Sequence, residues 1–146
     1  MTNRFMTSGD PAPRGDKRAE MRLLGAVPTF DQAPSSLLAA MVELGHVVRV
    51  RPHWALLAEQ TAPDKAYVLL DGAVDVRRRG ADLGRCRPGE ILGELGILRH
   101  RLRSATVVTA EPVTVLHLER TAFERLYDED PYFRALVGEA VLRKAG

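Results

Sequence analysis

The spacing of hydrophobic positions changes twice along the chain and divides it into three parts. Residues 35–43 repeat apolar side chains at helical spacing, which predicts a short helix with Ser35 or Ser36 as its cap. From His46 the period becomes two, which is typical of strands. After Leu118 the helical period returns. The predicted order is therefore helices, then strands, then helices.

The middle part predicts a series of short strands. Val48 and Val50 alternate with arginines, and further apolar runs lie at residues 55–60, 66–70, 73–79, 83–87, 104–109 and 113–118. Turn-forming pairs such as Asp71-Gly72 separate the runs. Many short strands at this spacing favour a closed or sandwiched β structure. The segment between Gly89 and Ser104 predicts a short helical turn and a loop instead.

The two ends of the chain have different patterns. Thr121 and Glu124 have the spacing of a capping box, and Asp130-Pro131 is a favourable helix start. An apolar stripe follows, so residues 131–144 are expected to form a C-terminal helix packed on the strands. Residues 1–19 have little to bury, which predicts a flexible tail before one domain over residues 20–146.

Composition narrows the class of protein. A chain of 146 residues, 45% of them hydrophobic, can bury one core but hardly two. The formal net charge of +2 is too small to imply nucleic-acid binding. One cysteine, Cys86, excludes a disulfide framework, and we read it as a half-buried structural residue. Because a chain without disulfides suits a reducing compartment, we expect a cytoplasmic protein, and no apolar run approaches the roughly 18 residues of a membrane span.

One segment combines residue types suited to an anion with a sugar. Gly93 and Gly96 allow close approach of the backbone, and a helical turn starting near Glu94 would direct unpaired N–H groups outward. Arg103 can bind a phosphate with two hydrogen bonds, and Ser104 can add a hydroxyl. A phosphate repels Glu94, but a ribose 2′-OH can donate to it. The combination points to a nucleotide.

This segment resembles the phosphate-binding cassette of the cyclic nucleotide-binding domain family. The matching runs are Gly93-Glu94-Leu95-Gly96-Ile97 and Arg103-Ser104-Ala105-Thr106. Residues 23–30, 66–74 and 88–90 resemble the family's entry helix, its central hairpin and the turn before the cassette. The resemblance covers about residues 22–135, and a match in several parts is far more specific than one glycine motif.

The resemblance implies a mainly β fold, an eight-stranded jelly-roll-like β roll with helices at both ends. It assigns the ribose 2′-OH to Glu94 and the cyclic phosphate to Arg103. The ligand-binding set it implies is Gly93, Glu94, Leu95, Arg103, Ser104 and Ala105. In the family the C-terminal helix swings over the base when the nucleotide binds, and residues 131–144 are the candidate lid.

Three turns depart from the family pattern. The family often has glycine near His53 and near Thr61, and this chain has none at either place. Both turns lie away from the cassette in the family fold, so we expect altered loops there and an intact site. The loop before Arg103 usually holds glycine and often proline, but here residues 99–102 read Arg-His-Arg-Leu. Its cations could strengthen phosphate attraction, or its shape could weaken binding.

The sequence shows no motif that is typical of an enzyme active site. Its four histidines, His46, His53, His100 and His117, form no metal-binding pattern, and no nucleophile–base pair or carboxylate dyad is visible. We therefore expect a non-enzyme without metal or cofactor. The favoured function is a regulatory module that binds a cyclic purine nucleotide, cAMP rather than cGMP, because Ser104 stands where cGMP-preferring members often carry threonine.

Two alternatives remain open. The fold could be a relic that has lost its ligand and serves protein interaction or oligomerisation. It could also be the sensor part of a longer transcription regulator, which would need a dimer helix and a helix-turn-helix domain after Gly146. The expected partner is an unidentified effector protein or a second copy through the C-terminal helix, and this chain alone is not expected to bind nucleic acid.

Overall fold

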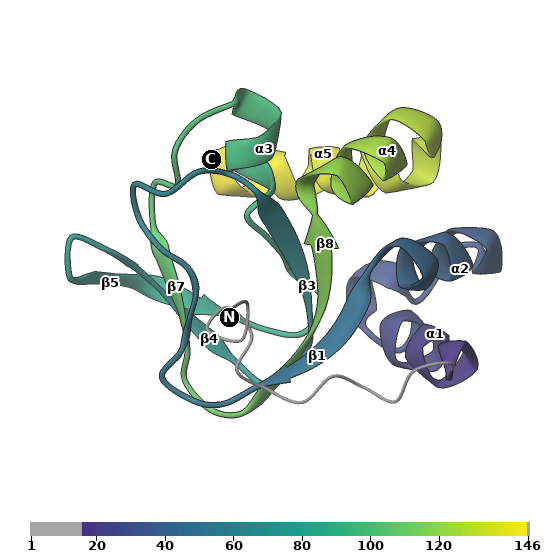
Figure 1. The fold of residues 1–146 in the computed structure, drawn as a ribbon, viewed down its shortest axis with the longest axis horizontal. Helices are drawn as coiled ribbons and strands as arrows, with labels where there is room; N and C mark the ends of the chain where they lie inside the picture. The colour runs from purple at the N-terminus through teal and green to yellow at the C-terminus, as the bar shows by residue number, and fades with distance from the viewer. Residues whose placement is uncertain (1–15, 146) are drawn as a thin grey trace, which may run out of the picture.

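Helices lie along one side of a β roll in the computed structural model, which describes residues 16–145 (Figure 1). The helices are α1 (Lys17–Gly25), the 3-10 turn η2 (Pro28–Phe30), α2 (Ser35–Leu44), α3 (Glu94–Arg99), α4 (Arg120–Glu129) and α5 (Pro131–Ala145). The strands are β1 (His46–Val50), β2 (Ala55–Leu57), β3 (Lys65–Asp71), β4 (Val74–Arg78), β5 (Ala81–Cys86), β6 (Ile91–Leu92), β7 (Thr106–Thr109) and β8 (Val113–Glu119). The predicted order of helices, strands and helices is confirmed.

The strands of the described residues form two sheets of four, in the orders β1-β8-β3-β6 and β2-β7-β4-β5. The pairings are antiparallel. This arrangement confirms the expected eight-stranded β roll, although the sequence pattern showed only seven of the strands. None of the helices described is long and apolar enough to cross a membrane.

Strand β3 belongs to two hydrophobic cores at once. Its residues alternate, with Ala66 and Val68 facing the helices and Tyr67 and Leu69 facing the inside of the roll. The outer core lies between this sheet and helices α1, α2, α4 and α5, and the inner core lies between the two sheets. Because both faces are covered, β3 is an almost continuous apolar run.

Several element ends differ from the sequence expectations. Strand β2 ends at Leu57 instead of residue 60, because the Glu59 N–H donates to the Thr106 side chain and Gln60 takes a left-handed conformation. Strand β6 was missed, since two residues are too short to show alternation. Helix α1 begins at Lys17, so the tail predicted over 1–19 was too long by at least three residues. The rest of that tail lies outside the described residues.

The predicted helix caps had mixed outcomes. Asp130 caps α5, because its Oδ1 accepts a hydrogen bond from the Phe133 N–H at 2.9 Å. The serine cap of α2 was wrong: Pro34 occupies the cap position and Ser35 is already helical. The capping box at Thr121 was also wrong, since α4 starts at Arg120 and Glu119 occupies its cap position. Both helices nevertheless bury apolar side chains in the outer core, Leu37 and Met41 from α2 and Phe123 and Leu126 from α4.

Candidate functional site

The six residues predicted to bind a ligand line one pocket of about 420 Å³. It lies between the β4–β5 hairpin, the β6–α3 turn and the last turn of α5. A volume of several hundred cubic ångströms is typical of a site for a small organic ligand. The residues that the structure brings together as predicted are Gly93, Glu94, Leu95, Arg103, Ser104 and Ala105.

Gly93 forms the turn between β6 and α3. Its φ of 90° lies in the left-handed region, where glycine carries no steric penalty. A Cβ atom there would lie 2.9 Å from Nη1 of Arg103 and 3.1 Å from the Leu57 side chain. The position therefore requires glycine for its conformation and for its contact with the arginine.

Glu94 follows at the start of α3, and its side chain is completely buried at 0% exposure. Its carboxylate meets the end of α5, where the Lys144 amino group lies 2.9 Å from Oε1 and 2.9 Å from Oε2. The same amino group donates to the backbone oxygen of Ile91 at 2.7 Å. The charge of the buried carboxylate is thus balanced from an element 50 residues away in the sequence.

Arg103 is buried to 4% exposure beneath the pocket. Its Nη1 donates to the Gly93 oxygen at 2.8 Å and its Nη2 donates to the Lys65 oxygen. Asp64, an exposed residue, has Oδ1 at 3.8 Å from Nη2. Burial lowers the pKa of the guanidinium, and the Asp64 charge opposes that effect. The side chain therefore joins β3 to the β6–α3 turn while facing the pocket.

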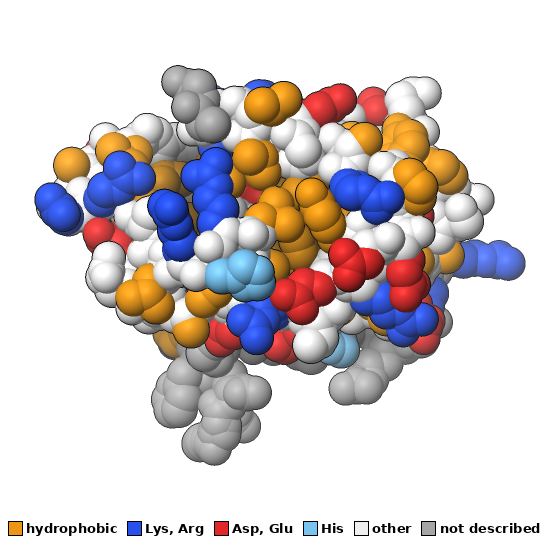
Figure 2. All heavy atoms as spheres, turned by 90° about the horizontal axis from the view of Figure 1, so that it is seen from above, with side chains coloured by type: hydrophobic (Ala, Val, Ile, Leu, Met, Phe, Trp, Pro, Cys, Tyr) orange, Lys and Arg blue, Asp and Glu red, His pale blue; other side chains and the backbone are white. Residues whose placement is uncertain are grey.

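The loop before Arg103 carries its cations outward. Arg99 and Arg101 are exposed, and on the face that carries α3, Lys and Arg side chains gather toward the β roll (Figure 2). The backbone of Arg103 exchanges hydrogen bonds with residues 60 and 61, at 2.8 and 2.9 Å. The unusual loop is therefore joined firmly to the roll, and its exposed charges favour the approach of an anion.

The two turns that lack the family glycines keep the backbone that glycine would favour. His53 has φ 62° and Gln60 has φ 65°, both in the left-handed region. At each position the chain keeps its hydrogen bonding, since the His53 and Gln60 N–H groups donate to backbone oxygens at 2.8 Å. The turn at Gln60 also lies beside the cassette, not away from it as expected, because residues 60 and 61 exchange backbone hydrogen bonds with Arg103.

The pocket also contains residues that sequence reasoning did not select. They come from α5, the β4–β5 hairpin and the turn before β6, and the polar ones are Lys144, Arg78, Arg85 and Glu90. Arg78 Nε donates to the backbone oxygen of Ser104 at 3.0 Å. Cys86 is buried in the wall, and burial raises the pKa of its thiol to about 12. No local pattern in the sequence singled out Lys144 as part of the site.

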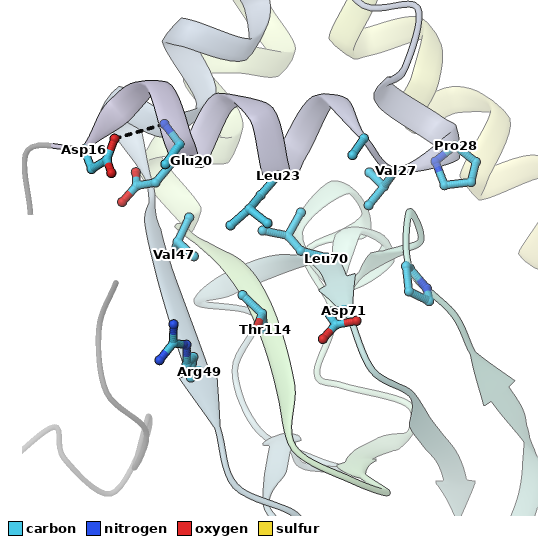
Figure 3. A pocket seen from close by; sticks show the side chains of 13 residues that line it. Asp16, Glu20, Leu23, Val27, Pro28, Val47, Arg49, Leu70, Asp71 and Thr114 are labelled. Atoms are coloured by element: carbon cyan, nitrogen blue, oxygen red, sulfur yellow. Dashed lines mark hydrogen bonds between the residues drawn. The ribbon is translucent and has the colours of Figure 1, made fainter. Parts of the chain in front are cut away.

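A second cavity, of about 540 Å³, lies between α1 and the sheet that contains β1, β8 and β3 (Figure 3). Leu23, Val27 and Leu70 supply its apolar wall, and Glu20 and Asp71 supply carboxylates. None of the predicted ligand-binding residues lines it. Across residues 16–145, no three His, Cys, Asp or Glu side chains lie close enough together to hold a metal ion.

Curated relatives resemble this chain over most of its length. It is 29% identical over 137 residues, 91% of its length, to a cyclic nucleotide-gated potassium channel of Mesorhizobium japonicum, of which it covers 37%. It is 30% identical over 95 residues, 65% of its length, to the cGMP-dependent protein kinase egl-4 of Caenorhabditis briggsae, of which it covers 13%. The chain thus spans far less than two thirds of these relatives.

Solved structures share the fold. A cAMP-binding acyltransferase from Mycobacterium smegmatis matches with a TM-score of 0.71 and 26% identity, over 88% of this chain and 42% of that one. The regulatory domain of Toxoplasma gondii PKA with cAMP matches with a TM-score of 0.72, over 86% of this chain and 49% of that one. Its 19% identity supports the fold alone.

The family assignment rests on the chain's own sequence. Residues 47–130, which extend from β1 to the end of α4, match the sequence model of the cyclic nucleotide-binding domain family. That range contains the β6–α3 turn, Glu94 and Arg103. This chain therefore belongs to the cyclic nucleotide-binding domain family and is a regulatory domain of that family.

Proposed function

We propose that this domain binds a cyclic purine nucleotide in the 420 Å³ pocket and prefers cAMP to cGMP. The observation that carries the proposal is the burial of Glu94 and Arg103 in the wall of one pocket, at 0% and 4% exposure. Burying two opposite charges is costly unless each has partners. Lys144 partners Glu94 and two backbone oxygens partner Arg103, and a ligand with a hydroxyl and a phosphate would add a further partner to each.

Arg103 would bind the cyclic phosphate. A guanidinium has five N–H donors, and the hydrogen bonds to Gly93 and Lys65 use two of them. The remaining donors can form the charge-assisted, bidentate contacts that phosphates favour. Because burial reduces screening by water, these contacts are stronger here than on an exposed surface.

Glu94 would accept a hydrogen bond from the ribose 2′-OH. Its Oε2 accepts no hydrogen bond from the described residues, although it lies near Lys144. The backbone N–H groups around Gly93 and Leu95, together with Ser104, would assist in binding the phosphate, and Ala105 lines the same pocket. The cAMP preference rests on Ser104, where family members that favour cGMP often have threonine.

The test is isothermal titration of the full chain with cAMP, with cGMP and 5′-AMP as comparisons. Arg103→Ala is expected to weaken cAMP binding by at least about 100-fold, because it removes the charge-assisted contact. Arg101→Ala is the matched control, since it removes an exposed arginine of the same loop. An unchanged dissociation constant for Arg103→Ala in folded protein would contradict the assigned site.

The ribose contact has its own test. Glu94→Gln is expected to bring the affinities for cAMP and 2′-deoxy-cAMP close together, because the carboxylate that distinguishes them is gone. The wild-type protein is expected to prefer cAMP over the deoxy analogue. If no cyclic nucleotide binds or raises the melting temperature at millimolar concentration, the proposal fails and the interaction-module alternative replaces it.

A further inference from the structure

The end of α5 is bound to the same carboxylate that the ribose would use. The Lys144 amino group contacts both oxygens of Glu94 and also donates to the Ile91 oxygen. In Figure 1 the C-terminal end of α5 lies beside α3. One side chain thus joins the last turn of the final helix to both sides of the β6–α3 turn.

Among the described residues, Lys144 supplies the hydrogen bond and the ion pair of the Glu94 carboxylate. The carboxylate has no exposed surface, and the Lys144 amino group lies 2.9 Å from each of its oxygens. A ribose hydroxyl must reach one of the same oxygens to donate its proton. Lys144 donates to Oε1 and lies 2.9 Å from Oε2, so a hydroxyl that approaches Oε2 meets an ammonium already beside that oxygen.

We propose that Lys144 is a built-in competitor of the ribose 2′-OH, so that nucleotide binding detaches the last turn of α5 from the site. This inference rests on the proposed function and adds the regulation of that site. The expected lid helix would then respond at its C-terminal end by losing a contact, and its displaced amino group would be the signal. Coupling of this kind is reciprocal: whatever holds Lys144 on Glu94 weakens nucleotide binding.

The rest of α5 is built to stay in place while its last turn moves. Phe133, Val137 and Ala140 are buried in the outer core. Beyond them, Leu142 is 73% exposed and the Lys144 side chain is 31% exposed. The displaced ammonium can therefore return to water directly, without unpacking the helix.

The first arm measures affinity by titration of the full chain. Lys144→Met is expected to tighten cAMP binding by about tenfold, because the free protein no longer holds the competing contact. Arg143→Met is the matched control, since it removes an exposed positive charge from the neighbouring position. Lys144→Arg retains a cation for Glu94 and is expected to stay close to the wild type.

The second arm uses 2′-deoxy-cAMP, which has no hydroxyl to compete for Glu94. Lys144→Met is expected to raise the affinity for cAMP and to leave the affinity for the deoxy analogue unchanged. If Lys144→Met weakens cAMP binding, Lys144 is a ligand contact and the proposal is overturned. An equal gain for both nucleotides would overturn it too, because the effect would not depend on the ribose hydroxyl.

The third arm needs no nucleotide. Amide hydrogen exchange in residues 141–145 is expected to speed up about tenfold in Lys144→Met and to stay unchanged in Arg143→Met. In the wild type, cAMP is expected to speed up the same amides. If no variant binds a nucleotide, the proposed function and the competition between Lys144 and the ribose are both overturned. Faster exchange in Lys144→Met would then show only that Lys144 holds the end of α5 on Glu94. Binding with no change at these amides would overturn the competition alone.

Discussion

Position 93 tolerates no side chain. The backbone there is left-handed, and the nearest atom to an added Cβ belongs to the arginine assigned to the phosphate. Gly80 offers a comparison, because its φ is 80° and an added Cβ would meet nothing within 4 Å. The two glycines therefore separate the effect of backbone strain from the effect of contact.

Gly93→Ala is expected to abolish measurable cAMP binding, because the methyl group displaces the Arg103 guanidinium as well as straining the turn. Gly80→Ala is expected to cost about 1 kcal/mol of stability and to leave binding unchanged. Titration and thermal melting of the two variants measure both quantities. Equal effects on binding would show that strain alone accounts for the loss.

His117 makes stability depend on pH. Burial lowers the pKa of its imidazole, and the nearby Glu119 carboxylate opposes that effect. Below about pH 6.5 the unfolded chain binds a proton that the folded chain does not, so the free energy of unfolding falls as the pH falls. The slope from this group is at most about 1.4 kcal/mol per pH unit.

Urea unfolding between pH 7 and pH 5 measures this slope. His117→Gln is expected to flatten it, because the group that gains the proton on unfolding is removed. His53→Asn is the control, since it removes an exposed histidine and asparagine tolerates the left-handed backbone. A slope that survives in His117→Gln would assign the pH dependence to other groups.

At the scale of elements, the short connections carry more strain than the strands. Residues 53, 60, 79 and 100 are non-glycine positions with positive φ, and each lies in a turn or at a helix end. Such conformations cost of order 1 kcal/mol each for an ordinary side chain. The turn at residue 60 also supports the Arg103 backbone, so the site depends on one of these strained connections.

Gln60→Gly is expected to stabilise the protein by about 0.5–1 kcal/mol, because glycine adopts this conformation without the steric penalty. The gain is below the full penalty, since glycine also has more freedom in the unfolded chain. Gln60→Ala is the matched control and removes the side chain without relieving the backbone. No gain in melting temperature over Gln60→Ala would mean that the turn is unstrained.

The sequence predicted most elements because their patterns are local. Alternation is visible in β1, β4 and β8, and the cassette residues lie within 13 positions of one another. Strand β6 has two residues and no period to detect. Lys144 escaped notice for a different reason: its contact with Glu94 depends on how α5 crosses the roll, and no local pattern encodes that.

At the scale of the whole molecule, β3 and β8 join the two cores. Both strands bury one set of side chains against the helices and the alternate set inside the roll. Neither core can lose its packing without exposing these shared strands to water. The helices and the roll should therefore unfold together.

Two probes can test this cooperativity. Trp54 is the only tryptophan and packs against the inner core, whereas the far-ultraviolet circular dichroism signal at 222 nm comes mainly from the helices around the outer core. The urea midpoints from tryptophan fluorescence and circular dichroism are expected to coincide, as they do in two-state unfolding. Separate midpoints would show that the helices detach from an intact roll.

The hydrogen bonds of Arg103 also give an evolutionary reason, apart from nucleotide binding, to retain this residue. The guanidinium joins carbonyl groups of β3 and of the β6–α3 turn, so the fold itself benefits from it. A descendant that stopped binding nucleotides would still lose stability if it lost this arginine. Selection for folding alone would preserve Arg103 long after the ligand was gone. An arginine conserved at this position in distant relatives would therefore reflect selection for the stability of the fold as well as selection for nucleotide binding.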